Sequence, residues 1–93
     1  MSQKPIVHIG TLHSKPEYTD TLIKSFEGLK QSPGYISHEC FRDIEDNNKL
    51  TLVERWETKK DHENFVNAFP KEEMEQWLNM LSQKGEESYY QEV

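Results

Sequence analysis

The segment LTLVERWE, residues 50–57, is the most informative stretch of the chain. Leu50, Leu52 and Trp56 share one face of an extended chain, and this alternation predicts a β-strand with one buried side. Glu54 interrupts that apolar row and lies on the same side as Leu52 and Trp56. A buried carboxylate is costly unless it has a partner. Glu54 therefore predicts either a structural ion pair or part of a functional site.

The segments before this strand predict a strand, a helix and a second strand. Residues 5–13 are rich in β-branched side chains, which favour an extended chain. An apolar helical stripe then begins at Pro16, a good first helical residue, and stops at Pro33-Gly34. Residues 35–43 predict the second strand, which a turn at residues 45–48 joins to the strand of LTLVERWE as a hairpin.

The segments after this strand predict two helices and a last short strand. Thr58 can cap a helix from Lys59, and Pro70 breaks that helix and begins the next. The third helical pattern includes Leu81 and ends at Lys84-Gly85, and residues 88–93 follow as a strand. The order β-α-β-β-α-α-β predicts one α+β domain over residues 1–93, with an antiparallel sheet and helices on one face.

Composition limits the classes of partner. The chain has 93 residues, a net charge of −6 and a hydrophobic content of 33%. An acidic chain is a poor ligand for nucleic acid and for anionic membranes, and no apolar run is long enough to span a bilayer. Cys40 is the only cysteine, so no intramolecular disulfide is expected. A cytoplasmic location is predicted.

The two faces of the predicted sheet have different roles. On the reverse face, Ile6, Leu12, Tyr35, Phe41 and Val53 are too apolar to leave in water without a reason. This predicts a homodimer in which the same face of a second copy covers them; the alternative is a solvated face. The helix-facing side is predicted to carry Val7, Ile9, Thr11, Ile36, His38, Cys40, Leu52, Glu54 and Trp56.

Several short motifs resemble those of a known family. Pro16 opens the first helix, Pro33-Gly34 precedes the second strand, and Glu54-Arg55-Trp56-Glu57 leads into a short helix. With this element order, the chain resembles the antibiotic biosynthesis monooxygenase domain of the dimeric α+β barrel superfamily, over roughly residues 6–93. The resemblance implies a ferredoxin-like homodimer with a pocket between sheet and helices. Characterised relatives oxidise phenolic or quinol-like aromatics with O₂ and use neither metal nor flavin.

The chain departs from the family at two positions of interest. Many relatives carry a histidine nine residues after the tryptophan, where this chain has Phe65. Relatives that oxidise polyketide quinols have an asparagine where this chain has Leu52. Haem-cleaving relatives carry a tryptophan at the position of Phe65, so haem cleavage is not expected. The catalytic residues of relatives do not carry over one by one.

Oxygenation without a cofactor needs a base, an apolar slot and dipoles that stabilise an anion, because removing a proton makes the substrate a better electron donor. His38 and Glu54 lie on adjacent strands and on the same predicted face, so we predict His38 as the base and Glu54 as its orienting partner; His62 is the second candidate for the base. The predicted substrate-binding residues are Trp56, Phe65, Leu52, Ile36 and Ile9. The alternative is that His38 and Glu54 form a buried structural contact.

The histidines have no matched i, i+4 spacing, so no metal site is predicted. The resemblance implies that the chain uses no cofactor. The predicted function is that of a monooxygenase-like oxidoreductase acting on a small aromatic, quinol-like or enolisable compound. Two alternatives remain: a non-catalytic module that binds a small hydrophobic ligand, and a structural dimer whose pocket is filled by its own side chains.

Overall fold

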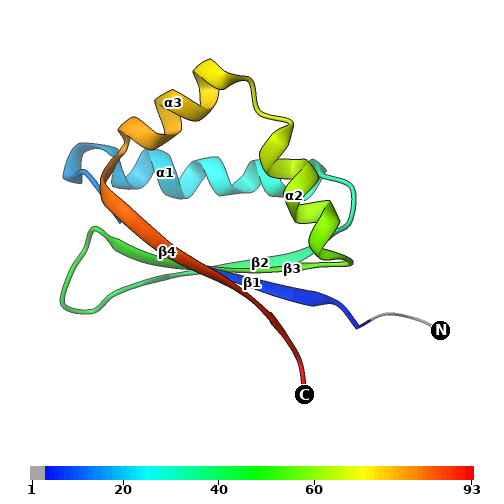
Figure 1. Ribbon diagram of the computed structural model, residues 1–93. Coiled ribbons are helices and arrows are strands. Elements are labelled where there is room, and N and C mark those ends of the chain that lie inside the picture. The colour runs from blue at the N-terminus through cyan, green and yellow to red at the C-terminus, as the bar shows by residue number, and fades with distance from the viewer. Residues whose placement is uncertain (1–3) are drawn as a thin grey trace.

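The computed structural model describes residues 4–93, which form a four-stranded antiparallel sheet with the helices on one face (Figure 1). The strand order is β2-β3-β1-β4. This confirms the predicted α+β class. In chain order the elements are β1 (Ile6–Ser14), η1 (Pro16–Tyr18), α1 (Thr19–Ser25), η2 (Phe26–Gln31), β2 (Tyr35–Arg42), β3 (Lys49–Trp56), α2 (Lys59–Asn67), α3 (Lys71–Asn79) and β4 (Leu81–Gln91).

The core lies between the first helical segment and β3. This helical segment consists of α1 and η2. Its apolar side chains pack onto those of β3: Leu22, Phe26 and Leu29 meet Leu50, Leu52 and Trp56. Every second residue of β3 is buried, from Leu50 to Trp56, in agreement with the alternation in its sequence. Each fully buried side chain of this size contributes about 1.5–3 kcal/mol. The even-numbered residues of β3 therefore mark the helix-facing side of the sheet.

The pairing of β1 with β3 corrects the predicted orientation of β1. Ile6 lies opposite Trp56, His8 opposite Glu54, and Leu12 opposite Leu50. These even-numbered residues of β1 therefore face the helices, and Ile6 and Leu12 pack against the core. The prediction that Val7, Ile9 and Thr11 face the helices was wrong, because both faces of β1 carry apolar residues and a one-residue shift reverses every side chain.

A register shift between Tyr35 and Ser37 corrects the start of β2. Tyr35 lies opposite Trp56 and packs against the core, although it was predicted on the reverse face. Ile36 was predicted to face the helices but is 44% exposed. An extra residue in one strand changes which side chains point inward. Beyond the shift, His38 lies on the helix-facing side as predicted.

The end of the third helix was also predicted too late. Asn79 is the last residue of α3, and Leu81 already pairs with Ser14 of β1 as the first residue of β4. Leu81 points inward just after the helix and continues its apolar spacing, so the apolar pattern of the sequence could not separate the end of α3 from the start of β4. Gly85 lies inside β4, where a Cβ atom would collide with the backbone oxygen of Thr11. Glycine permits this close approach of the two strands.

Among the described residues, no helix is both long enough and apolar enough to cross a membrane.

Candidate functional site

Glu54 lies at the centre of a buried polar cluster, and both of its carboxylate oxygens have partners. It is 3% exposed. Trp56 lies two residues further along the same face of β3, and its indole N–H donates to Glu54 Oε1 over 3.0 Å. Oε2 lies 3.0 Å from Nδ1 of His8. The buried carboxylate in the LTLVERWE segment therefore has the partners that its burial requires.

His8 reaches this cluster from β1, as the cross-strand neighbour of Glu54. Its ring is 6% exposed, and its second nitrogen, Nε2, lies 3.6 Å from the carboxylate of Glu87 on β4. This Nε2 has no hydrogen-bond partner among residues 4–93. Burial disfavours the charged ring, but the hydrogen bond and charge of Glu54, followed by the charge of Glu87, outweigh it and raise the pKa of His8.

His62 enters from the other side of the cluster, on α2. Thr58 caps this helix as predicted, because its hydroxyl accepts a hydrogen bond from the backbone N–H of Asp61. The His62 ring stacks on His8 with 4.0 Å between centroids. Its Nδ1 lies 2.6 Å from the hydroxyl of Tyr89 on β4, and its Nε2 lies 4.0 Å from Glu54 Oε1.

The environments of the two stacked histidines move their pKa values in opposite directions. Burial, followed by the charge of His8, lowers the pKa of His62, against the opposing effect of Glu54. The pKa of its neighbour His8 is raised. At pH 6.5, the ordinary histidine pKa, the pair therefore favours one imidazolium, on His8 against the carboxylate, and one neutral imidazole, on His62. Opposed shifts of this kind separate the roles of proton donor and proton acceptor.

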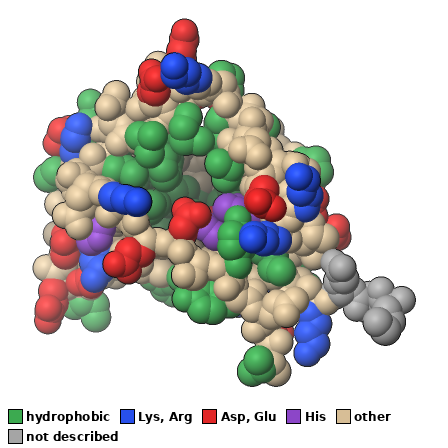
Figure 2. All heavy atoms as spheres, viewed as in Figure 1, with side chains coloured by type: hydrophobic (Ala, Val, Ile, Leu, Met, Phe, Trp, Pro, Cys, Tyr) green, Lys and Arg blue, Asp and Glu red, His purple; other side chains and the backbone are tan. Residues whose placement is uncertain are grey.

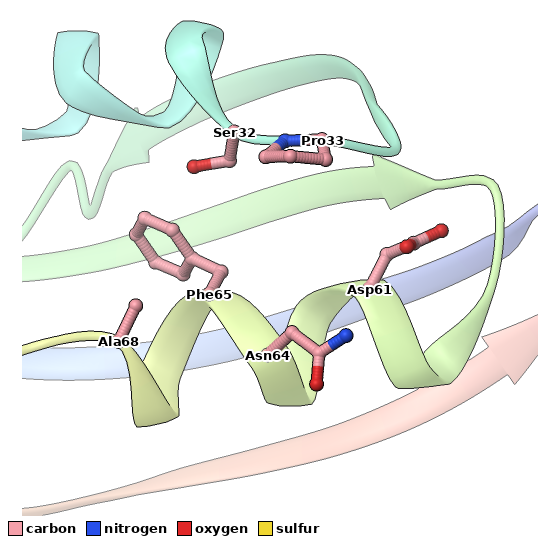
Figure 3. A pocket seen from close by; sticks show the side chains of 6 residues that line it. All are labelled: Ser32, Pro33, Asp61, Asn64, Phe65 and Ala68. Carbon is pink, nitrogen blue, oxygen red and sulfur yellow. The ribbon is translucent and has the colours of Figure 1, made fainter.

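Aromatic side chains separate this cluster from a cleft at the surface. The ring of Phe65 lies 5.4 Å from the Trp56 ring and 6.4 Å from the His62 ring, centroid to centroid. Figure 3 shows Phe65 pointing from α2 toward the segment of Ser32 and Pro33 across the cleft. The cleft has a volume of about 300 Å³, and its lining consists of Ser32, Pro33, Asp61, Asn64, Phe65 and Ala68.

A second hollow opens beneath the helices on the face shown in Figure 2. Hydrophobic side chains frame it, and histidine and acidic side chains are visible at its lower edge. β4 runs along this side of the molecule in Figure 1. Because His62 contacts Tyr89 and His8 faces Glu87, the polar cluster lies against β4.

The structure brings together only part of the predicted site. Glu54, Trp56 and His62 meet in one cluster, Phe65 adjoins it, and Leu52 is buried in the core beside it. The contact between a carboxylate and an imidazole was predicted correctly in kind. The imidazole, however, belongs to His8.

Three predicted residues lie elsewhere. His38 is opposite Glu54 in the register, but its Nδ1 lies 2.7 Å from the hydroxyl of Tyr35, so its ring is held by that residue. The hydrogen-bond partners of Glu54 in the described part of the chain are His8 and Trp56. Ile9 lies on the reverse face of the sheet, and Ile36 is exposed at the register shift. These positions do not fit the roles that the sequence suggested.

His8 and Tyr89 were not predicted from the sequence to belong to the site. It was also not predicted that three potential metal-binding residues would lie together. His8, Glu54 and His62 each offer an atom that could bind a metal, and these atoms lie within 4.8 Å of one another. They come from β1, β3 and α2, so no short spacing in the sequence connects them. The only signal for His8 was its even position on β1, which mattered once the register with β3 was known.

Comparison with known proteins identifies the family. The profile of the antibiotic biosynthesis monooxygenase family matches residues 5–80. The chain belongs to this family. No curated protein sequence is similar enough to be matched.

Solved structures agree with the family fold. A conserved protein from Methanosarcina mazei Go1 superposes with a TM-score of 0.80 at 21% identity, over 99% of this chain and 96% of that one. A putative antibiotic biosynthesis monooxygenase from Bordetella bronchiseptica gives 0.76 at 19% identity, over 98% and 99%. SnoaB, a cofactor-independent oxygenase from Streptomyces nogalater, gives 0.78 at 14% identity, over 98% and 95%. At these identities the likeness establishes the fold that the family members share.

Proposed function

We propose that the protein is a monooxygenase that oxidises a small aromatic, quinol-like or enolisable compound with O₂, without metal or flavin. Its membership of the monooxygenase family supports the reaction class. The observation that carries the proposal is the pair of buried histidines around Glu54, one with a raised and one with a lowered pKa. A pair of this kind provides both a base and a positive partner for the anion that the base creates.

His62 is the base in this proposal. Its lowered pKa keeps the ring neutral near pH 7, and its Nδ1–H can donate to the hydroxyl of Tyr89, which leaves the Nε2 lone pair free. The proton of a phenolic or enolic hydroxyl passes to this Nε2. The charged ring of His8, held against Glu54, then stabilises the substrate anion. His62 thus takes the role of base that the sequence analysis assigned to His38.

The substrate anion supplies all the electrons for the reduction of O₂. For a substrate whose enolisable position is a methylene, the balance is CH₂ + O₂ → C=O + H₂O. One oxygen atom forms the new carbonyl and the other leaves as water. No further reductant is needed, so the residues must only remove the proton, stabilise the anion and exclude bulk water.

Oxygen uptake with a panel of quinols and anthrone-like compounds tests the proposal. Removing a positioned base lowers the rate by about 10²–10⁴-fold, so His62→Ala should lose uptake to that extent. His38→Ala is the matched control, because His38 also has a tyrosine hydroxyl on Nδ1 but, within residues 4–93, no carboxylate partner; the uptake of this variant should be unchanged. No uptake with any compound, or equal uptake by both variants, would contradict the catalytic assignment.

A second candidate is a non-catalytic module that binds a small hydrophobic ligand. The cleft of about 300 Å³ beside Phe65 favours it, because this cleft is open to a ligand whereas His8, Glu54 and His62 are at most 6% exposed. The same compounds distinguish the two candidates: a binding module retains one of them in equilibrium dialysis but consumes no O₂.

The reverse face of the sheet supports a homodimer. Phe41 and Tyr90 are 53% and 51% exposed on this face, beside the partly buried Ile9 and Val53. We propose that the same face of a second copy covers them. Light scattering should then give about twice the 11.1 kDa mass of the chain, and Phe41→Glu should give the single mass. A monomeric wild-type protein would contradict this arrangement. The cytoplasmic location stays a prediction.

A further inference from the structure

We propose that His8, Glu54 and His62 form a binding site for one divalent transition-metal ion. Two imidazole nitrogens and one carboxylate oxygen are a donor set that suits zinc and other first-row ions, with open coordination positions for water or substrate. All three side chains are at least nine-tenths buried, with exposures of 6%, 3% and 5%.

The distances in the cluster are close to those of a metal centre. For bonds of about 2.1 Å, neighbouring ligand atoms lie about 3.0–3.4 Å apart. His8 Nδ1 and Glu54 Oε2 are already 3.0 Å apart, with a proton between them that an ion would replace. His62 Nε2 lies 4.0 Å from Glu54 Oε1, so a small rotation of the His62 ring completes the set.

Two of the three ligands, His62 and Glu54, also have an outer partner that holds their other polar atom. The hydroxyl of Tyr89 holds His62 Nδ1 at 2.6 Å, which directs Nε2 toward Glu54. The indole of Trp56 holds Glu54 Oε1, which leaves Oε2 for an ion. Metal-binding histidines and carboxylates are ordinarily oriented by such partners.

The unpartnered nitrogen of His8 points to the same conclusion. Its buried Nε2 has no hydrogen bond within residues 4–93, and an oxygen of the Glu87 carboxylate lies 3.6 Å away. A simple ion pair between His8 and Glu54 leaves this nitrogen unexplained. A metal on Nδ1 would make the Nε2–H a stronger donor and draw the exposed carboxylate of Glu87 onto it, which completes the outer shell.

This inference does not rest on the proposed function, which uses the metal-free state of the same three side chains. A bound ion would take the Nε2 lone pair that His62 needs to accept a proton from the substrate. Metal binding can be measured with no substrate present, so a failure of either proposal is seen separately.

Titration of the purified, metal-free chain with Co²⁺ tests the site, because Co²⁺ bound to imidazole and carboxylate absorbs visible light. We expect one ion per chain, displaced by Zn²⁺. His8→Ala should weaken binding by at least about tenfold, and Tyr89→Phe by about tenfold, since loss of an outer partner alone costs about 10–100-fold. His13→Ala is the matched control: His13 lies on the same strand but on the reverse face, opposite Lys49, and its loss should leave the affinity unchanged.

A thermal unfolding measurement keeps the test valid if His8→Ala does not fold. An ion that binds only the folded chain raises its melting temperature, so Zn²⁺ should stabilise the wild type and His13→Ala but not the milder variant His62→Gln. The proposal is overturned if Co²⁺ does not bind, or if wild type and the folded His8 and His62 variants bind it equally.

Discussion

Two tyrosine–histidine pairs lie on the helix-facing side of the sheet, and only one of them belongs to a cluster that could perform chemistry. Tyr89 bonds to His62 over 2.6 Å, and Tyr35 bonds to His38 over 2.7 Å. The bonds themselves are nearly identical. The pairs differ in what surrounds them: His62 is 5% exposed and stacked on His8 beside Glu54, whereas His38 is only partly buried.

The comparison shows that the buried carboxylate gives the site its character. Glu54 raises the pKa of His8, whereas burial, followed by the charge of His8, lowers the pKa of His62. His38 is across the strand from the same residue, but its side chain turns to Tyr35. Both pairs have a tyrosine hydroxyl on one histidine nitrogen. The pair of Tyr89 and His62 also adjoins a second histidine, His8, whose pKa is shifted in the opposite direction to that of His62.

Removal of the carboxylate should have the largest effect. Glu54→Ala leaves the Trp56 indole N–H and the charged His8 ring buried without their acceptor, so we expect a loss of about 3–5 kcal/mol in the free energy of unfolding. Glu39→Ala, on the neighbouring strand, is the matched control. Glu39 forms an exposed ion pair with Arg55, which is worth about 0.2–1 kcal/mol. Urea denaturation measures both; similar losses would refute the central role of Glu54.

Loss of His8 should cost less and should change the pH dependence of stability. A hydrogen bond to a charged group contributes about 1.5–3 kcal/mol, which is the loss expected for His8→Ala. The stability that a raised pKa gives to His8 is full below pH 6.5 and is lost as pH rises through that pKa. The lowered pKa of His62 acts in the opposite sense, since its contribution is full above pH 6.5 and is lost as pH falls through that pKa.

The cluster should therefore stabilise the fold most at a pH between the lowered pKa of His62 and the raised pKa of His8. The difference in unfolding free energy between wild type and the double variant His8→Ala/His62→Ala, followed from about pH 5 to about pH 8, should pass through a maximum there. A difference that only rises or only falls over this range would show that the two histidines do not hold opposite charge states.

The smallest expected effect compares the two tyrosines directly. Tyr89→Phe and Tyr35→Phe each remove one hydrogen bond to a histidine, so both should lower stability by about 0.5–1.5 kcal/mol. Only Tyr89→Phe should also lower oxygen uptake, because it frees the base from its orienting partner. Equal effects of the two changes on uptake would remove the distinction between the pairs.

The sequence predicted the elements whose pattern was unambiguous. β3 alternates strictly, so its buried face and the exceptional position of Glu54 could be recognised. Thr58 marks the start of α2, and Pro70 separates α2 from α3, so His62 could be placed on a short helix beside the sheet.

The remaining part of the site depended on register, which the local pattern did not determine. Ile6 and Leu12 on one face of β1 are matched by Val7 and Ile9 on the other, so apolar alternation could not tell that His8 points inward. The register shift before Ser37 likewise reversed the start of β2. Pairing with neighbouring strands settles both points, and a single sequence carries no direct record of that pairing.

The most direct test of the account is an NMR pH titration of the four histidine rings in the wild type and in Glu54→Gln. The account predicts that His8 titrates above pH 6.5 and His62 below it, and that the pKa of His8 falls in Glu54→Gln because the charge of the carboxylate is lost. If His8 titrates at or below the pKa of His62, or does not respond to Glu54→Gln, then Glu54 does not organise the site.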